Sequence, residues 1–243
     1  MRLTLFTRWA VPLLALPALA AAPDGNEILK KVDAYRNPIE YYSVDVELTT
    51  LHREESRTWD FRVYGNGSDT SLLEFRAPAA DKGKYYLMLR DDMWIYLPNT
   101  SRPLRISPLQ RLAGEASNGD VARTSYSVDY NAEVAGEDKV DGREALVLEL
   151  KGKDTDMSYS RVKMWVVKKS YEPIQAEFYA MSGKLMKRAF FREFGTMLGK
   201  PVVTTIEIQD ALRPQHSTIM RYANLQSKRY PEKMFSRNYL GKW

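Results

Sequence analysis

The segment from Lys84 to Gln110 (KYYLMLRDDMWIYLPNTSRPLRISPLQ) constrains the fold most, because it predicts a β-hairpin that has no polar face. Two apolar and aromatic runs, Tyr85–Leu89 and Met93–Leu97, flank a short polar turn. Side chains alternate between the two faces of a strand, so Trp94 and Tyr96 share one face and their neighbours the other. An antiparallel sheet usually leaves one face in water. This hairpin needs apolar cover on both sides, either as the floor of an apolar cavity or as a central hairpin without a ligand.

The rest of the chain favours a mainly β protein with one helix. Asp24–Tyr35 has apolar residues at helical spacing and predicts a short amphipathic helix. From Tyr41 to Leu225 apolar and polar residues alternate with a period of two, in runs that include Arg57–Tyr64, Tyr126–Val134 and Ser158–Lys168. The pattern predicts about ten or eleven strands in an antiparallel sheet bent into a barrel or half-barrel.

The connection from Pro98 to Asp120 has a different composition. It contains several prolines and glycines, and only Ser107–Ala116 has the pattern of a helical turn. Long connections inside a compact domain often serve as lids or binding loops. The segment is our candidate lid, and an ordinary long crossover is the alternative.

Residues 1–22 have the features of an export signal. Arg2 and Arg8 form a charged start, Trp9–Leu19 is an apolar core, and Ala18-Leu19-Ala20 resembles a cleavage site. The sequence has no cysteine, so an exported chain would have neither a lipid anchor nor a disulfide. We expect residues 23–243 to form a single domain, free in the periplasm.

Charge and motifs exclude several classes of function. The net charge is +5, from 36 basic and 31 acidic residues that are mixed along the chain. A nucleic-acid-binding protein would concentrate basic residues on one face, so we expect no nucleic acid as partner. The only histidines, His52 and His216, lie in unrelated segments, and no serine has the spacing of a nucleophile elbow.

The carboxylates also suggest no catalytic centre. Asp91-Asp92 fits a hairpin turn, and Asp154–Asp156 fits a polar loop. A pair of carboxylates acting on a glycan is the enzyme class that sequence leaves open. We therefore expect no enzyme, with no catalytic residues, no metal site and no cofactor.

Several segments resemble the LolA-like outer-membrane lipoprotein-sorting proteins. They are MWIYLPNTSRPLRISPLQR, SNGD, SVDY, DGREALVLEL, SRVKMWVVKKSYEPIQAEFYAMSGKLMKRAFF and KPVVTTIEIQD. The resemblance extends from about Glu27 to Leu240. It implies a half-open antiparallel β-barrel, covered on one side by helical segments and a lid.

The resemblance also implies a function. Members of this family carry the acyl chains of a lipoprotein or lipid in an apolar interior, between the inner and outer membranes. An RND-type (MMPL-like) inner-membrane permease is the partner that the resemblance suggests. Two other functions stay open: a periplasmic domain that senses lipid or lipoprotein, and a hydrolase of the cell envelope.

The candidate cavity residues are large apolar side chains of the predicted strands. The alternation does not decide which strand face turns inward, so the set draws on both faces. It comprises Trp59, Phe61, Leu73, Phe75, Leu87, Met88, Trp94, Tyr96, Met164, Trp165 and Phe178.

Overall fold

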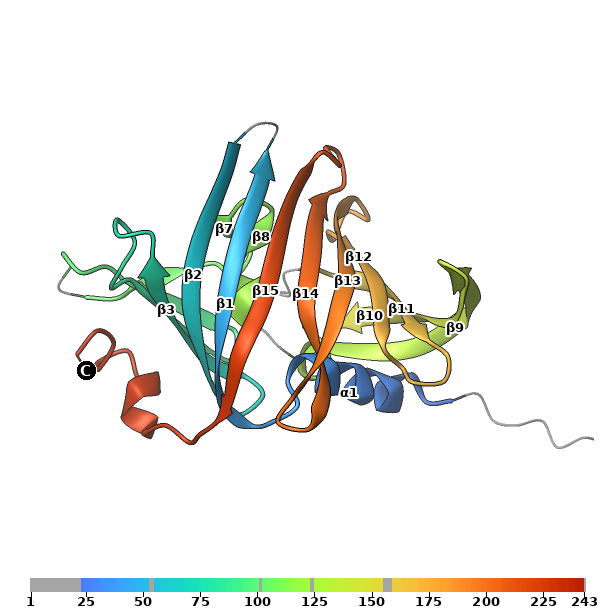
Figure 1. Ribbon diagram of the computed structural model, residues 1–243, viewed down its shortest axis with the longest axis horizontal. Helices are drawn as coiled ribbons and strands as arrows, with labels where there is room; N and C mark the ends of the chain where they lie inside the picture. Colours follow the sequence, from blue (N-terminus) through green and yellow to red (C-terminus); the bar gives the residue numbers. More distant parts are fainter. Residues whose placement is uncertain (1–22, 53–54, 101, 123–124, 155–158, 243) are drawn as a thin grey trace, which may run out of the picture.

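One large antiparallel sheet of 13 strands forms the protein (Figure 1). The structure is a computed structural model that describes residues 23–52, 55–100, 102–122, 125–154 and 159–242. The predicted export signal, residues 1–22, lies outside these ranges. The strand order is β6-β5-β4-β3-β2-β1-β15-β14-β13-β12-β11-β10-β9. Because β6 and β9 are edges that do not pair with each other, the barrel is half-open, as predicted.

The strands fall into two groups along the chain. The first group is β1 (Tyr41–His52), β2 (Glu55–Asn66), β3 (Thr70–Ala77), β4 (Tyr85–Leu89), β5 (Asp92–Tyr96), β6 (Leu104–Ile106), β7 (Arg111–Ala113) and β8 (Ala116–Ser117). The second group is β9 (Tyr130–Val140), β10 (Arg143–Gly152), β11 (Arg161–Val167), β12 (Pro173–Tyr179), β13 (Leu185–Met197), β14 (Lys200–Asp210) and β15 (His216–Ser227). The β7–β8 ribbon is a separate two-stranded sheet.

The helices are few and short. They are α1 (Gly25–Arg36), α2 (Asn118–Ala122), α3 (Tyr126–Asp129) and the 3₁₀ turn η1 (Glu232–Phe235). The predicted helix is confirmed as α1. Asp24 caps its first turn by accepting the N–H of Asn26 at 2.9 Å. Its apolar stripe packs against β9, β14 and α3.

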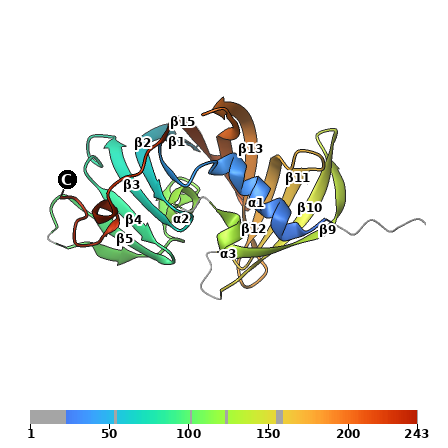
Figure 2. The ribbon, with the colours of Figure 1, turned by 90° about the horizontal axis from the view of Figure 1, so that it is seen from below.

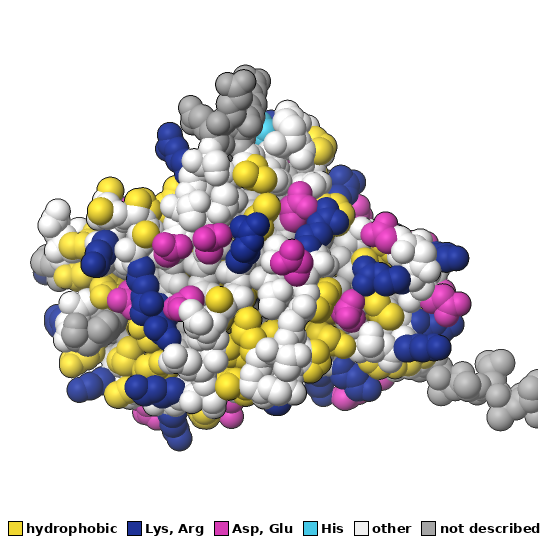
Figure 3. All heavy atoms as spheres, in the orientation of Figure 1, with side chains coloured by type: hydrophobic (Ala, Val, Ile, Leu, Met, Phe, Trp, Pro, Cys, Tyr) yellow, Lys and Arg dark blue, Asp and Glu magenta, His cyan; other side chains and the backbone are white. Residues whose placement is uncertain are grey.

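The sheet bends into two wings that are covered on the concave side. Figure 2 shows β2–β5 in one wing and β9–β13 in the other, with α1 lying along the second wing. The short helices α2 and α3 lie between the wings. The convex face of the central strands carries mixed charges (Figure 3), among them the ion pairs of Arg76 with Asp45 and of Arg221 with Glu47.

The β4–β5 hairpin has apolar cover on both faces, as predicted. On the concave side Met88 and Met93 belong to the main core. On the convex side Leu87 packs in a second cluster with Phe235 and Leu240. This C-terminal segment wraps around the outside of the first wing (Figure 1), which supplies the second apolar layer.

Two segments differ from the sequence prediction. The helical turn expected within Ser107–Ala116 is wrong, because this region forms the β7–β8 ribbon and leads into α2. The strand expected at Tyr126–Val134 begins with α3 and becomes β9 only at Tyr130. The protein also has more strands than predicted, because β6 of the large sheet and β7 and β8 of the separate ribbon are only two or three residues long and too short for an alternating pattern.

Candidate functional site: the covered concave face

The concave face of the sheet is apolar and lies beneath short elements of the 104–129 segment. Val46 and Leu48 of β1 and Met220 of β15 are buried in its centre. From the opposite side, Val121 of α2 and Ala116 of β8 complete the same core. The later part of the predicted connection and the helices that follow it therefore cover the concave face. We name residues 111–122 and 125–129, from β7 to α3, the cover segment.

The structure brings seven of the eleven candidate cavity residues to the concave core. Six of them are buried and Trp59 is partly buried against the same cluster: the seven are Trp59, Phe61, Leu73, Phe75, Met88, Met164 and Phe178. Among them, Met88 and Phe178 border cavities on this side of the sheet.

The other four candidates lie on the convex side. Leu87, Trp94 and Tyr96 pack beneath the C-terminal segment. Trp165 lies in a third cluster and donates a 2.9 Å hydrogen bond to Asp138. The reason is the alternation itself: two neighbours in one strand, such as Met164 and Trp165, face opposite sides. These four residues therefore lie on the face of the sheet opposite the cover segment.

Three cavities lie between the cover segment and the sheet, and all three border Arg36. Their volumes, counted together with the open solvent at their mouths, are about 460, 510 and 270 Å³. The first is lined by aromatic rings and by the carboxyl side chains of Asp120 and Asp129, and the second by valines of β1, β2 and β14. The third is lined by Met220 and Ile208 and by the Lys187–Asp120 pair. Tyr126 and Phe178 separate the first from the third, so the spaces form a chain of pockets.

A wider cleft lies where the two wings come close to each other. Its empty volume is about 800 Å³. Arg90 at the β4–β5 turn borders it on one side and Lys153 after β10 on the other, while Met88 and Val128 contribute apolar surface. The cleft therefore reaches from a charged rim to the apolar concave face.

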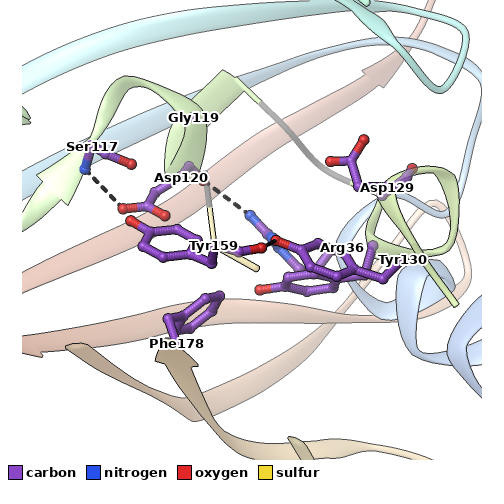
Figure 4. Close-up of a pocket in the computed structure, with 10 residues that line it drawn as sticks. Arg36, Ser117, Gly119, Asp120, Asp129, Tyr130, Tyr159 and Phe178 are labelled. Atoms are coloured by element: carbon purple, nitrogen blue, oxygen red, sulfur yellow. Dashed lines mark hydrogen bonds between the residues drawn. The ribbon is translucent and has the colours of Figure 1, made fainter. Parts of the chain in front are cut away.

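A buried ion pair connects the cover segment to the sheet. The Lys187 ammonium of β13 contacts the Asp120 carboxylate of α2, and the two side chains are 6% and 12% exposed. The ammonium also lies over the rings of Tyr159 and Phe178, 4.6 and 4.9 Å from their centroids. Figure 4 shows Asp120, Tyr159 and Phe178 around the same pocket.

The groups around Lys187 raise the pKa of its ammonium. Burial by itself lowers the pKa of Lys187, but the Asp120 carboxylate and the Tyr159 hydroxyl outweigh it and raise the pKa above its ordinary value. Asp120 is further oriented because it accepts the N–H of Ser117 at 2.8 Å. The ammonium is therefore positively charged at neutral pH.

Arg36, at the end of α1, is a second contact to α2. Its guanidinium donates to the backbone carbonyl of Asp120 at 3.2 Å and lies 5.3 Å from the Tyr126 ring centroid. Burial tends to lower the pKa of Arg36, but Tyr126, Tyr222 and Asp33 raise it. Two cations, the partly buried Arg36 and the buried Lys187, thus contact the same residue of the cover segment.

Helix α1 also holds α3. The Asp33 carboxylate accepts the backbone N–H groups of Tyr126 and Ser127 at 2.7 and 2.8 Å. Burial raises the pKa of Asp33, although these hydrogen bonds act in the opposite direction. Asn26 accepts the N–H of Ala132 at 2.9 Å, which ties the start of β9 to the same helix.

The β7–β8 ribbon touches the two central strands through its turn. The N–H of Glu115 donates to the Thr218 hydroxyl at 2.8 Å. Gly114 has a φ of +55°, and a Cβ there would overlap the side chains of Thr50 and Thr218. A glycine is therefore needed for the ribbon to lie this close to β1 and β15.

The sequence prediction missed the polar residues of the site. Lys187 shares the inward face of β13 with Ala189 and Phe191, so a lysine in an otherwise apolar row was a signal that could have been found. Asp120 carried no comparable signal, because α2 is only five residues long.

The residues that the structure describes show neither a cluster of metal ligands nor a membrane-spanning helix. They contain no group of three or more histidine, cysteine or acidic side chains that could hold a metal ion. None of their helices is long and apolar enough to span a bilayer.

The fold matches solved structures. A LolA superfamily protein from Nitrosomonas europaea superimposes with a TM-score of 0.84 at 32% identity, over 90% of this chain and 100% of that chain. The chain belongs to the LolA superfamily. The resemblance seen in the sequence is therefore confirmed.

Other comparisons place this LolA superfamily protein among similar folds. A domain assigned to outer membrane lipoprotein-sorting proteins, from Vibrio parahaemolyticus, has a TM-score of 0.76 at 24% identity over 90% of this chain and 98% of that one. A DUF1329 family protein from Desulfovibrio piger has a TM-score of 0.76 at 25% identity, over 89% and 97%. A family described as an uncharacterized protein matches residues 67–242. A comparison with curated proteins found no match.

Proposed function

We propose that this LolA superfamily protein is a periplasmic carrier, not an enzyme, that holds acyl chains of a lipoprotein or lipid against its concave face. The observation that carries the proposal is an apolar concave face that lies under the cover segment. Polar contacts of Arg36, Lys187 and Asp33 hold this segment in place. Membership in a superfamily that includes lipoprotein-sorting domains supports the same function.

The physics of carriage requires the cover segment to move. Burying one methylene group contributes about 0.8 kcal/mol, so a chain of sixteen carbons gains on the order of 10 kcal/mol. The pockets are divided by Tyr126 and Phe178, so entry of such a chain has to displace the cover segment. The free energy of opening lowers the net affinity, which makes release possible.

The wide cleft between the wings supplies the entry route in this proposal. It is the place where the charged rim at Arg90 and Lys153 meets the apolar surface of Met88. A headgroup can remain at the rim while the acyl chain passes inward. An RND-type (MMPL-like) inner-membrane permease is the proposed donor or acceptor of the cargo.

The test compares two faces of the same wing. Phe178→Ala changes a wall of two concave pockets, whereas Trp165→Ala changes the convex cluster. We expect uptake of a fluorescent fatty acid by the purified protein to change with Phe178→Ala and to stay at the wild-type level with Trp165→Ala. Equal uptake by all three proteins, or no uptake and no co-extracted lipid in mass spectrometry of the wild-type protein, would contradict the carrier function.

A further inference from the structure

We propose that the Lys187 ammonium binds the anionic group of the ligand, and that Asp120 occupies this position while the cavity is empty. The inference rests on the proposed carrier function and names its ligand class: an acyl chain that bears a carboxylate or a phosphate.

Stability alone gives little reason for a lysine here. Lys187 as a whole residue is 4% exposed, and it lies in one row with Ala189 and Phe191, both in the apolar core. Removing a charge from water costs several kcal/mol, and replacing a buried ion pair with apolar residues is often neutral or stabilising. A buried ion pair in an apolar cavity is therefore better explained by binding.

The two partners come from different parts of the fold. Lys187 belongs to the sheet, and Asp120 belongs to the short helix α2 of the cover segment. When the cover segment moves away, the carboxylate leaves and the ammonium stays with the Tyr159 and Phe178 rings. An anionic group of the ligand can then restore the lost ion pair.

The pocket beside the ion pair offers a further polar group. The Ser117 hydroxyl lines the 460 Å³ cavity, and Ser117 is 6% exposed. Its oxygen makes no hydrogen bond of acceptable geometry among the described residues. This hydroxyl neighbours Tyr159, which also faces Lys187, so it can donate a hydrogen bond to an anionic group that Lys187 binds.

The neighbouring groups leave the ammonium as the best anion partner. Burial raises the pKa of Tyr126, Tyr159 and Tyr222, so their hydroxyls are neutral near pH 7. Arg36 donates to the Asp120 carbonyl and also faces Tyr222 of β15, which raises its pKa and stays with the sheet when α2 moves.

The test uses three probes with the same alkyl chain: hexadecanoate, hexadecyl phosphate and hexadecanol. Dissociation constants are measured for the wild-type protein, Lys187→Met and Asp120→Asn. We expect the wild type to bind one or both anions at least about tenfold more tightly than hexadecanol. Lys187→Met should abolish that preference, whereas Asp120→Asn should increase it, because the internal competitor is gone. The two anions distinguish a carboxylate from a phosphate ligand.

Opposite effects of the two variants on the preference for anions distinguish anion binding from a simple contact between the cover segment and the sheet. If the ion pair only holds the cover segment closed, Lys187→Met and Asp120→Asn should change all three probes in the same direction, and this outcome overturns the inference. Equal wild-type binding of hexadecanol and the anions also overturns it but leaves the carrier function intact. Binding of none of the probes contradicts the carrier function itself.

Two further variants keep the test valid if Lys187→Met folds poorly. Lys187→Arg retains the cation and should retain the preference for anions. Lys187→Met combined with Asp120→Leu leaves no unpaired buried charge, and should fold and bind hexadecanol without preferring the anions. A preference that persists in this double variant would overturn the inference.

Discussion

The carboxylate of Asp33 lies 2.7 Å from the backbone nitrogen of Tyr126, and this contact joins α1 to the start of α3. Asp33 is far from α3 in sequence, so no local preference of the chain creates the contact. The helix that the sequence predicts most clearly thus positions a helix that the sequence did not predict.

Asp33→Ala should loosen the cover segment. The substitution removes the acceptor of two backbone N–H groups, those of Tyr126 and Ser127. We expect a loss of about 1–3 kcal/mol in the free energy of unfolding, measured in denaturant. Glu27→Ala is the matched control, because it removes an exposed carboxylate from the same helix that pairs with the exposed Lys30. Equal losses in the two variants would contradict the role of Asp33.

The stability difference between the wild-type protein and Asp33→Asn should depend on pH. Burial raises the pKa of Asp33 in the folded protein above the value of 3.8 expected when it is unfolded. The folded state therefore binds the proton more tightly, and protonation stabilises it. As the pH falls from 7 towards 4, the wild type should gain stability relative to Asp33→Asn, in which this position cannot titrate. A constant difference across this range, followed by denaturant unfolding, would show that the pKa is not raised.

Gly114→Ala should displace the β7–β8 ribbon from the sheet. The new Cβ would overlap Thr50 and Thr218, and φ is +55°. Gly183→Ala is the control, because Gly183 has a φ of +79° but nothing near the position of its Cβ. Both variants lose about 1 kcal/mol to backbone strain. Only Gly114→Ala should also speed hydrogen exchange at the Glu115 amide, which donates to Thr218; similar exchange in both variants would argue against this contact.

Trp94→Ala should affect the C-terminal segment and not the uptake of acyl chains. Trp94 packs on the convex side with Phe235 and Leu240, and the Arg237 guanidinium lies 4.5 Å from its ring centroid. We expect fatty-acid uptake at the wild-type level and faster tryptic cleavage after Lys233 or Arg237. Loss of uptake with an unchanged cleavage rate would mean that Trp94 belongs to the binding site after all.

The features that the sequence predicted correctly depend on residues that are close together in the chain. The cap at Asp24 and the apolar stripe of α1 are local, so the helix was predicted correctly. The alternation in Tyr85–Leu89 and in β5 showed that the hairpin needs cover on two sides, although it could not show that Phe235 and Leu240 provide one of them.

The orientation of the strands could not be predicted in the same way. Met164 and Trp165 are both large and apolar, and only the curvature of the whole sheet decides which one faces inward. The polar site was missed because Arg36, Asp120 and Lys187 come from three separate segments. Their meeting depends on the tertiary fold and not on any motif.

The open shape leaves two strands, β6 and β9, with backbone groups that no neighbouring strand uses. The unpaired backbone groups of an edge strand can pair with a strand of another molecule. In this protein both edge strands are poorly suited to such pairing. The border at β6 is three residues long. The border at β9 displays Glu133, Glu137, Asp138 and Lys139 to solvent and is interrupted by a register shift. The open sheet thus presents edges that are short or charged, which hinders strand pairing with a second copy of the chain.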